Sequence, residues 1–168
     1  MPQDDALGLQ LDDGNYQAFE RLYLDHFARV RSFLRIYLGD AAAVEDLAQD
    51  TFLQVWLHPN RYDPTRSNLK TYLYTIARRR AADWFRHRQP AGGDEDRAEP
   101  TGTHSGETFA LKDALDRLPP DLRNALWLRE VEGYSYDELA AILDIPLGTV
   151  RSRLFAAREQ LRRIWKSK

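Results

Sequence analysis

The pattern of apolar positions predicts a protein made of helices. Apolar residues recur every three or four positions through most of the 168-residue chain, and no segment alternates with the period of two that is typical of a strand. In the first half, Gly39 can end one helix, and Asp40 can cap a second helix that Pro59 stops. A loop over 58–67 then leads to a third long helix over 68–88.

The second half contains further helix boundaries. One helix stops at Pro119 and Pro120, and Asp121 is expected to cap the next helix. That helix should run to Val131, with Gly133 beyond its end. The expected fold class is therefore all-α in both halves of the chain.

The segment 134–163 has the pattern of two helices joined by a tight turn. Ser135 and Glu138 have the three-residue spacing of a capping box, which indicates where the first helix begins. The helix breaks at 144–146, and Pro146 is suited to the first position of the following helix. The segment is typical of a helix-turn-helix, with an ordinary helical hairpin as the alternative.

The second helix of this segment has two distinct faces. One apolar stripe is formed by Val150, Leu154, Ala157 and Leu161. The opposite face carries Gly148, Thr149, Ser152, Phe155 and Ala156, flanked by Arg151 and Arg153. Small and hydroxyl side chains flanked by arginines suit a helix inserted into the major groove of DNA.

The distribution of charge indicates two contacts with nucleic acid. The formal net charge of the chain is −2, which alone would not indicate a DNA-binding protein. Residues 61–88 and 150–168, however, each carry a net charge of +6, and the segments around them are acidic. Because local potential governs the attraction of phosphates, we expect one nucleic-acid contact in each half and an acidic surface for a protein partner.

A change of composition divides the chain into domains. Residues 89–107 are rich in glycine, proline and acidic residues and lack apolar periodicity, so they are expected to form a flexible linker. We therefore expect a flexible tail over 1–14 and two small helical domains over 15–88 and 108–168.

Several classes of protein are disfavoured by what the sequence lacks. Cysteine is absent, and the four histidines are scattered without a metal-binding, phosphate-binding or Ser-His-Asp arrangement. We therefore expect no catalytic residue, no metal site and no cofactor, in a protein that is not an enzyme. The acidic N-terminus lacks the apolar run of a signal peptide, and no stretch has the length of a membrane span. We expect a cytoplasmic protein without membrane insertion.

Two helices of the first domain carry candidate binding surfaces. A polar stripe on the second helix, at positions i, i+3, i+4 and i+8, consists of Asp46, Gln49, Asp50 and Gln54. This stripe is either a solvated face or a docking surface for a basic partner helix, and the pattern alone does not decide between them.

The third helix interleaves basic and aromatic residues, a combination suited to single-stranded nucleic acid. The residues concerned are Lys70, Arg78, Arg79, Arg80, Arg86 and Arg88, with Tyr72, Tyr74, Trp84 and Phe85 between them. Trp84 and Phe85 are expected to belong to the core, given their register with the apolar residues of this helix. Tyr62, in the preceding loop, and Tyr72 or Tyr74 are the candidates for stacking on bases.

Three motifs, in this order around the acidic segment, carry a family resemblance. They are DLAQDTFLQVW, LKTYLYTIARRRAADWFRHR and LPPDLRNALWLREVEGYSYDELAAILDIPLGTVRSRLFAARE. The chain resembles a small sigma factor of bacterial RNA polymerase, of the extracytoplasmic-function (ECF) kind, over about residues 15–88 and 109–165.

The resemblance implies partners and residue roles. The implied partners are core RNA polymerase, promoter DNA in duplex and melted form, and an anti-sigma factor. The contacts with the polymerase would be made to the clamp helices of the largest subunit, by Asp46, Gln49, Asp50 and Gln54, and to the flap of the second-largest subunit. The −10 element would be read and melted by Tyr62, within the loop 61–67, and by Lys70, Tyr72, Arg78, Arg79 and Asp83. The −35 element would be read by Arg129, Pro146, Gly148, Thr149, Arg151, Ser152 and Phe155.

Two positions depart from the pattern of the family. Many relatives have asparagine where this chain has Arg79, so recognition at the −10 element is expected to differ. Ala156 stands where some relatives carry a basic residue, which removes one expected phosphate contact near the −35 element.

The main alternative is a stand-alone regulator with a helix-turn-helix and a helical sensory domain. Such a regulator should bind duplex DNA alone, usually as a symmetric dimer. A sigma factor should bind promoter DNA specifically only together with core polymerase. The regulator hypothesis leaves the basic and aromatic helix over 68–88 unexplained.

Overall fold

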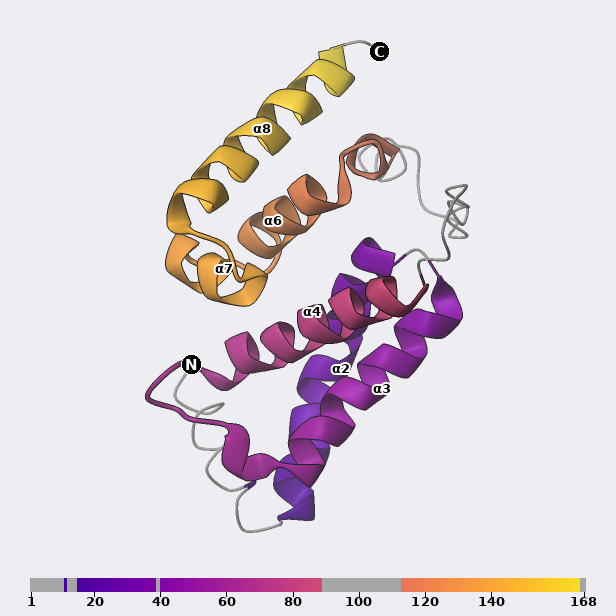
Figure 1. Ribbon diagram of the computed structural model, residues 1–168, viewed down its shortest axis with the longest axis vertical. Coiled ribbons are helices and arrows are strands. Elements are labelled where there is room, and N and C mark those ends of the chain that lie inside the picture. Colours follow the sequence, from indigo (N-terminus) through magenta and orange to yellow (C-terminus); the bar gives the residue numbers. More distant parts are fainter. Residues whose placement is uncertain (1–10, 12–14, 39, 89–112, 167–168) are drawn as a thin grey trace. The chain divides into compact units, whose positions relative to one another are not determined.

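The computed structural model describes residues 11, 15–38, 40–88 and 113–166 (Figure 1). The chain forms two compact units, Met1–Arg97 and Ala98–Lys168. Every regular element among the described residues is helical, which confirms the expected all-α fold class. No described helix combines the length and the apolar character that crossing a membrane requires.

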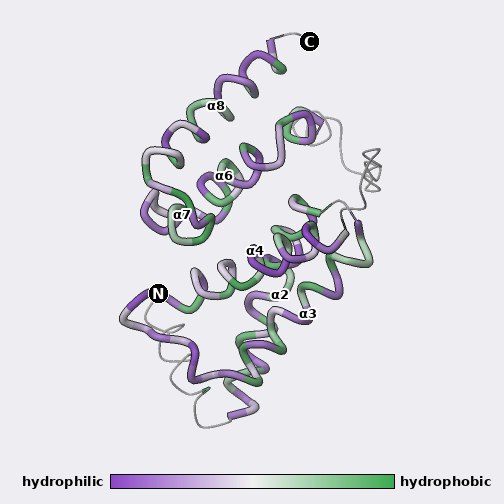
Figure 2. Tube along the Cα trace, viewed as in Figure 1, coloured by the Kyte–Doolittle hydropathy of each residue, from purple (hydrophilic) through white to green (hydrophobic). Residues whose placement is uncertain are grey.

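Unit 1 is built from three long helices that pack on one another: α2 (Tyr16–Leu38), α3 (Ala41–Leu57) and α4 (Leu69–Arg88). A short 3-10 turn, η1 (Pro59–Arg61), follows α3 (Figure 1). Along each helix the hydropathy alternates between apolar and polar every few residues (Figure 2), as expected for helices with one buried face. The largest fully buried side chains of this unit are Leu22, Phe33, Leu34, Phe52, Leu69, Leu73 and Tyr74.

The start of α3 confirms the cap expected from the sequence. The Asp40 carboxylate accepts hydrogen bonds from the backbone N–H groups of Ala42 and Ala43, at 3.0 and 3.1 Å. These bonds satisfy two of the donors that a helix leaves free at its N-terminus. The helix ends at Leu57, just before Pro59.

The end of α4 differs from the expectation that Trp84 and Phe85 lie in the core. Trp84 is half-buried, Phe85 is 39% exposed, and the two rings meet edge to face with centroids 5.2 Å apart. At 100° per residue, Phe85 lies about 120° around the helix from the buried Leu73. Trp84 keeps the phase of the buried face but lies in the last two turns of the helix.

Unit 2 contains α6 (Pro120–Glu130), α7 (Tyr136–Leu143) and α8 (Leu147–Lys166). Residues 113–116 are also helical. One core cluster is formed by Leu118, Leu126 and Ala157, and α8 packs on both α6 and α7. The stripe expected on α8 is confirmed at Val150, Leu154 and Ala157, which are fully buried, whereas Leu161 is only half-buried.

Two helix starts in unit 2 differ by one or two residues from the expectation. Pro119, not Asp121, is the N-cap of α6, and Asp121 lies in the first turn. Pro146 precedes α8 instead of forming its first residue, and its carbonyl accepts from the N–H groups of Thr149 and Val150 at 2.9 and 3.1 Å. A proline lacks an N–H group and therefore fits on either side of a helix start. Helix α6 ends at Glu130, one residue before the expected Val131.

The turn between α7 and α8 has the geometry of a helix-turn-helix. The capping box is confirmed: the Ser135 hydroxyl accepts from the Glu138 N–H at 3.2 Å, and the Glu138 carboxylate accepts from the Ser135 N–H at 2.8 Å. At the other end of α7, Asp144 adopts a left-handed conformation with φ of 55°. This conformation ends the helix, in the way that a left-handed C-cap residue commonly does.

Replacing Ser135 with alanine is expected to lower the free energy of unfolding of unit 2 by about 1 kcal/mol, because it removes the hydroxyl that caps α7. Urea denaturation of the full chain, followed through hydrogen exchange of the α7 amides, measures the change. Ser32→Ala in α2 is the control, since the Ser32 hydroxyl bonds the carbonyl of Ala28 in mid-helix and caps nothing. Equal losses in both variants would contradict the capping role.

Part of the expected organisation lies outside the described residues. This applies to the linker over 89–107, to Gly39, to the start of the helix before Pro119, and to the tail over 1–14 apart from Leu11. Leu11 itself is helical and only 2% exposed.

Candidate nucleic-acid and partner interfaces

The polar stripe of α3 lies on the surface of unit 1. Asp46, Gln49 and Asp50 are exposed. Gln54 is half-buried, and its side-chain oxygen accepts a hydrogen bond of 3.0 Å from the Arg80 guanidinium of α4. Three of the four residues are therefore available to a partner, and the fourth connects the stripe to α4.

Two apolar side chains beside this stripe were not singled out from the sequence. Leu53 and Leu57 are 51% and 59% exposed, one helical turn apart on α3. The signal was present in the sequence, because both fall outside the apolar stripe of Val44, Ala48 and Val55. An exposed apolar pair next to carboxylates is a mixed surface that suits a protein partner.

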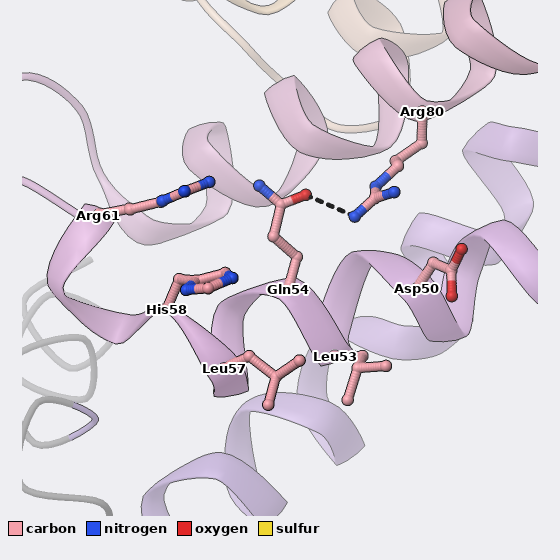
Figure 3. A pocket seen from close by; sticks show the side chains of 7 residues that line it. All are labelled: Asp50, Leu53, Gln54, Leu57, His58, Arg61 and Arg80. Atoms are coloured by element: carbon pink, nitrogen blue, oxygen red, sulfur yellow. Dashed lines mark hydrogen bonds between the residues drawn. The ribbon is translucent and has the colours of Figure 1, made fainter.

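An open pocket joins α3, η1 and α4 at this place (Figure 3). The Gln54 amide and the Arg80 guanidinium meet across it, with His58 and Arg61 on the side of η1 (Figure 3). The residues lining the pocket are Asp50, Leu53, Gln54, Leu57, His58, Arg61 and Arg80. The lining contains basic side chains as well as the carboxylate of Asp50, so the surface has both signs of charge.

Two of the three candidates for stacking on bases are buried, and of these Tyr62 departs from the expectation. Tyr74 is 1% exposed and packs edge to face on Phe33, with centroids 5.2 Å apart, so it belongs to the core. Tyr62 is also buried, at 7% exposure, and its ring lies 5.5 Å from that of Tyr72. Only Tyr72 is half-exposed, and the faces of the other two rings are covered by protein in this structure.

Tyr72 has cationic neighbours. Burial raises the pKa of its hydroxyl, and the positive charges of Arg61 and Arg79 act in the opposite direction. Arg79 is exposed on α4, whereas Arg78 and Lys70 are half-buried. These residues form a basic region around one aromatic ring, which is the composition expected of a surface for unpaired nucleic acid.

Asp83 lies one turn beyond these cations on α4. Its carboxylate forms an ion pair with Arg86, and its backbone carbonyl lies 2.7 Å from the Nδ1 atom of His87. The charge of Asp83 is therefore balanced within the helix, which lowers its repulsion of a nearby phosphate.

The outer face of α8 is accessible. Gly148, Arg151, Ser152 and Phe155 are exposed, and Phe155 reaches 69% exposure although it is a large apolar residue. Thr149 is half-buried, and its carbonyl accepts a hydrogen bond of 3.0 Å from the Ser152 hydroxyl. This is the face that the sequence predicts for the major groove.

The arginines around α8 divide into two groups. Arg153 pairs with Asp121 of α6 at 2.9 Å, and Arg158 pairs with Glu130 at 2.8 Å. The hydrogen bond to Glu130 is the main cause that raises the pKa of Arg158. These two arginines connect α8 to α6, whereas Arg151 is exposed and forms no ion pair with the described residues.

Arg129 has a structural role that its sequence position does not reveal. Its guanidinium donates a 2.7 Å hydrogen bond to the carbonyl of Tyr134 and lies 5.2 Å from the ring centre of Tyr136. Arg129 thus fixes the connection between α6 and α7. Any contact with a DNA backbone would use its remaining N–H groups.

Comparisons with known proteins connect these surfaces to one family. The chain matches the family models of Sigma-70 region 2 over residues 22–90 and of Sigma-70 region 4 over residues 108–161. It is 36% identical over 160 residues to the RNA polymerase sigma factor CarQ of Myxococcus xanthus, covering 90% of this chain and 91% of CarQ. It is 35% identical over 181 residues to the ECF RNA polymerase sigma-E factor of Escherichia coli (strain K12), covering 94% and 92%.

Two solved structures have a similar fold. One is the co-crystal structure of the sigma factor RpoE with the anti-sigma factor NepR from Bartonella quintana, with a TM-score of 0.75, 30% identity, and coverage of 88% of this chain and 96% of that chain. The other is CnrH in complex with the cytosolic domain of CnrY, with a TM-score of 0.74, 25% identity, and coverage of 98% of both chains.

Proposed function

Because this chain belongs to the ECF sigma factors of RNA polymerase, we propose that its surfaces divide the work of promoter recognition between the two units. A sigma factor binds core RNA polymerase and directs initiation to promoters by reading the −10 and −35 elements. The observation that carries the residue assignment is the presence of a basic, accessible helix face in each unit, on α4 and on α8, together with the polar stripe of α3, which carries two exposed carboxylates.

The α3 stripe is proposed to dock on the clamp helices of the largest polymerase subunit. Asp46 and Asp50 are exposed carboxylates one helical turn apart, and the exposed apolar side chains of Leu53 and Leu57 continue the same surface. Carboxylates would set the orientation of a basic helix, and burial of the leucines would supply affinity. Region 4 is proposed to bind the flap of the second-largest subunit.

The α4 surface is proposed to hold the melted −10 element. Arg61 and Arg79 lie near Tyr72, so cations that can bind phosphates surround a half-exposed ring. The burial of Tyr62 changes its proposed role: in this structure it supports the loop before α4, and the exposed residues of that loop are available to a base.

The α8 surface is proposed to read the −35 element in the major groove. Arg151→Ala is expected to weaken binding by about 1–3 kcal/mol on the matching sequence, and to relax specificity at one position, if its guanidinium reads a base edge. Binding of the holoenzyme to promoters with single substitutions in the −35 element measures this effect.

The control for this experiment is Arg163→Ala, an exposed arginine near the other end of the same helix. Its replacement should leave sequence specificity unchanged. A uniform loss across all −35 sequences in the Arg151→Ala variant would instead identify a phosphate contact.

Regulation by an anti-sigma factor is proposed from the two similar solved structures. The first is a complex of a sigma factor with the anti-sigma factor NepR, and the second is a complex of CnrH with the cytosolic domain of CnrY. A non-enzymatic role, in the cytoplasm where polymerase and chromosome are found, follows from the same assignment. The stand-alone regulator is not favoured, because the match to Sigma-70 region 2 spans the helices that such a regulator would use as a sensor.

A further inference from the structure

The loop between η1 and α4 is fixed at both of its ends. At its start, the Tyr62 ring is buried against Tyr72. At its end, the Asn68 side-chain oxygen accepts a 2.7 Å hydrogen bond from the N–H of Thr71, in the first turn of α4. Between these two anchors, residues 63–66 are all exposed.

Asp63 closes this loop into a defined turn. Its carboxylate oxygen Oδ1 accepts from both the backbone N–H and the hydroxyl of Thr65, at 2.9 and 2.6 Å. Its carbonyl accepts from the N–H groups of Arg66 and Ser67, at 3.1 and 3.4 Å. Four hydrogen bonds therefore converge on one exposed residue, which is the pattern by which aspartate stabilises a turn.

The carboxylate of Asp63 is ionised at neutral pH. The hydrogen bond from the Thr65 hydroxyl is the main cause that lowers its pKa, followed by the bond from the Thr65 N–H, and the charge of Arg66 acts in the same direction. The anion is the form that accepts these bonds best. Their contribution is present above the ordinary pKa of aspartate and is lost as the pH falls through the lowered value.

The sign of this charge argues against a direct contact with DNA. A carboxylate repels phosphates, and it stands here in a stretch, 61–88, whose net charge is +6. Among the described residues, the hydrogen bonds of Asp63 are all internal to the loop. We therefore expect Asp63 to act by fixing the conformation of the loop.

We propose that Asp63 is a positioning residue that preforms the loop 62–68 to receive an unpaired base of the melted −10 strand. The inference rests on the proposed function of this surface. A loop that is already ordered loses little conformational entropy when it binds a base, whereas a flexible loop loses more. The cations near Tyr72 would hold the neighbouring phosphates, and the preformed turn would present residues 64–66 to the base.

The test uses the holoenzyme, assembled from core RNA polymerase and the full chain, and fork-junction DNA whose non-template −10 strand is unpaired. Single abasic sites are placed at each −10 position in turn. With the wild-type chain, one position is expected at which loss of the base weakens binding. Asp63→Ala is expected to weaken binding of the intact fork about tenfold, and to have little effect when the base at that position is absent.

Two conservative variants separate positioning from charge. Asp63→Asn keeps an oxygen that can accept from Thr65, so it is expected to stay within about threefold of the wild type. Thr65→Ser keeps the hydroxyl and should behave likewise, whereas Thr65→Val removes it and should lose affinity in the same base-dependent way as Asp63→Ala. Asp25→Ala, at an exposed aspartate of α2, is the matched control and should have no effect.

Three outcomes would overturn the inference. They are an Asp63→Ala variant that binds the intact fork as tightly as the wild type, a loss of equal size on intact and abasic forks, and a wild-type chain for which no abasic position matters. A melting temperature within a few degrees of the wild type would show that Asp63→Ala is folded. If Asp63→Ala is unfolded, Thr65→Val provides the same test. A wild-type chain that adds nothing to the fork binding of core enzyme would instead contradict the proposed function itself.

Discussion

Replacing both Asp46 and Asp50 with lysine is expected to weaken the affinity for core RNA polymerase by about two orders of magnitude. Each substitution removes an exposed carboxylate from the α3 stripe and places a like charge against a basic partner helix. Both side chains are exposed on α3, so the fold of unit 1 should be unchanged. Titration of labelled chain with core enzyme measures the affinity, and circular dichroism checks the helix content.

The matched control reverses two charges elsewhere on the same unit. Glu20→Lys with Asp25→Lys changes the net charge by the same amount at exposed positions of α2. This variant should retain most of the affinity, with a small loss from long-range electrostatics that salt removes. Equal losses in both double variants would show that only net charge matters and would contradict the docking assignment.

Tyr62→Ala is expected to impair strand opening about a hundredfold more than duplex binding. Removal of a buried ring leaves a cavity that typically costs 3–5 kcal/mol for a large aromatic residue. Tyr72, 5.5 Å away, loses its packing partner, and the loop before α4 loses its first anchor. A fluorescent base in the −10 strand reports strand opening, and a gel-shift assay with an unmelted promoter reports duplex binding.

Tyr62→Phe is the control for this prediction, because it keeps the ring that packs on Tyr72. It should open strands at nearly the wild-type rate if the ring acts by supporting the loop. Equal impairment of opening and duplex binding in Tyr62→Ala would show a general loss of folding in unit 1 and would contradict a specific role in melting.

The helix boundaries were largely predictable because their signals are local. Asp40 caps α3, and Ser135 and Glu138 cap α7, through hydrogen bonds to residues two or three positions away. Such short-range chemistry can be identified from the order of the residues alone. Two helix starts were misplaced by one or two positions. The N-cap of α6 is Pro119 instead of Asp121, and Pro146 precedes α8 instead of beginning it. Proline is tolerated at several places near a helix start, so its position does not fix the boundary.

The burial of the aromatic residues of unit 1 was less predictable. Tyr62 is buried and Phe85 is partly exposed, both against the expectation from the sequence, and of the two alternatives Tyr72 and Tyr74 it is Tyr74 that is buried. The phase of a helix gives the direction of a side chain, but its burial depends on how far the neighbouring helices extend over it. Tyr74 is covered by Phe33 of α2, a residue 41 positions away in the chain, which periodicity cannot reveal.

The candidate sites were predictable as surfaces but not in their connections. The exposure of Asp46 and Asp50, and of Arg151 and Phe155, follows from helical spacing. Two hydrogen bonds do not follow from helical spacing. Gln54 accepts a hydrogen bond from Arg80, 26 positions later, and Arg129 donates one to the carbonyl of Tyr134 after α6. These bonds depend on the packing of one helix against another element, and they exist only in the folded unit.

Run-off transcription with purified core RNA polymerase on a library of promoters tests the central claim most directly. The expected result is initiation that requires this chain, from templates that share one −10 and one −35 element, with no specific duplex binding by the chain alone. The contradicting result is a lack of initiation on every template together with specific binding of duplex DNA by a symmetric dimer of the free chain.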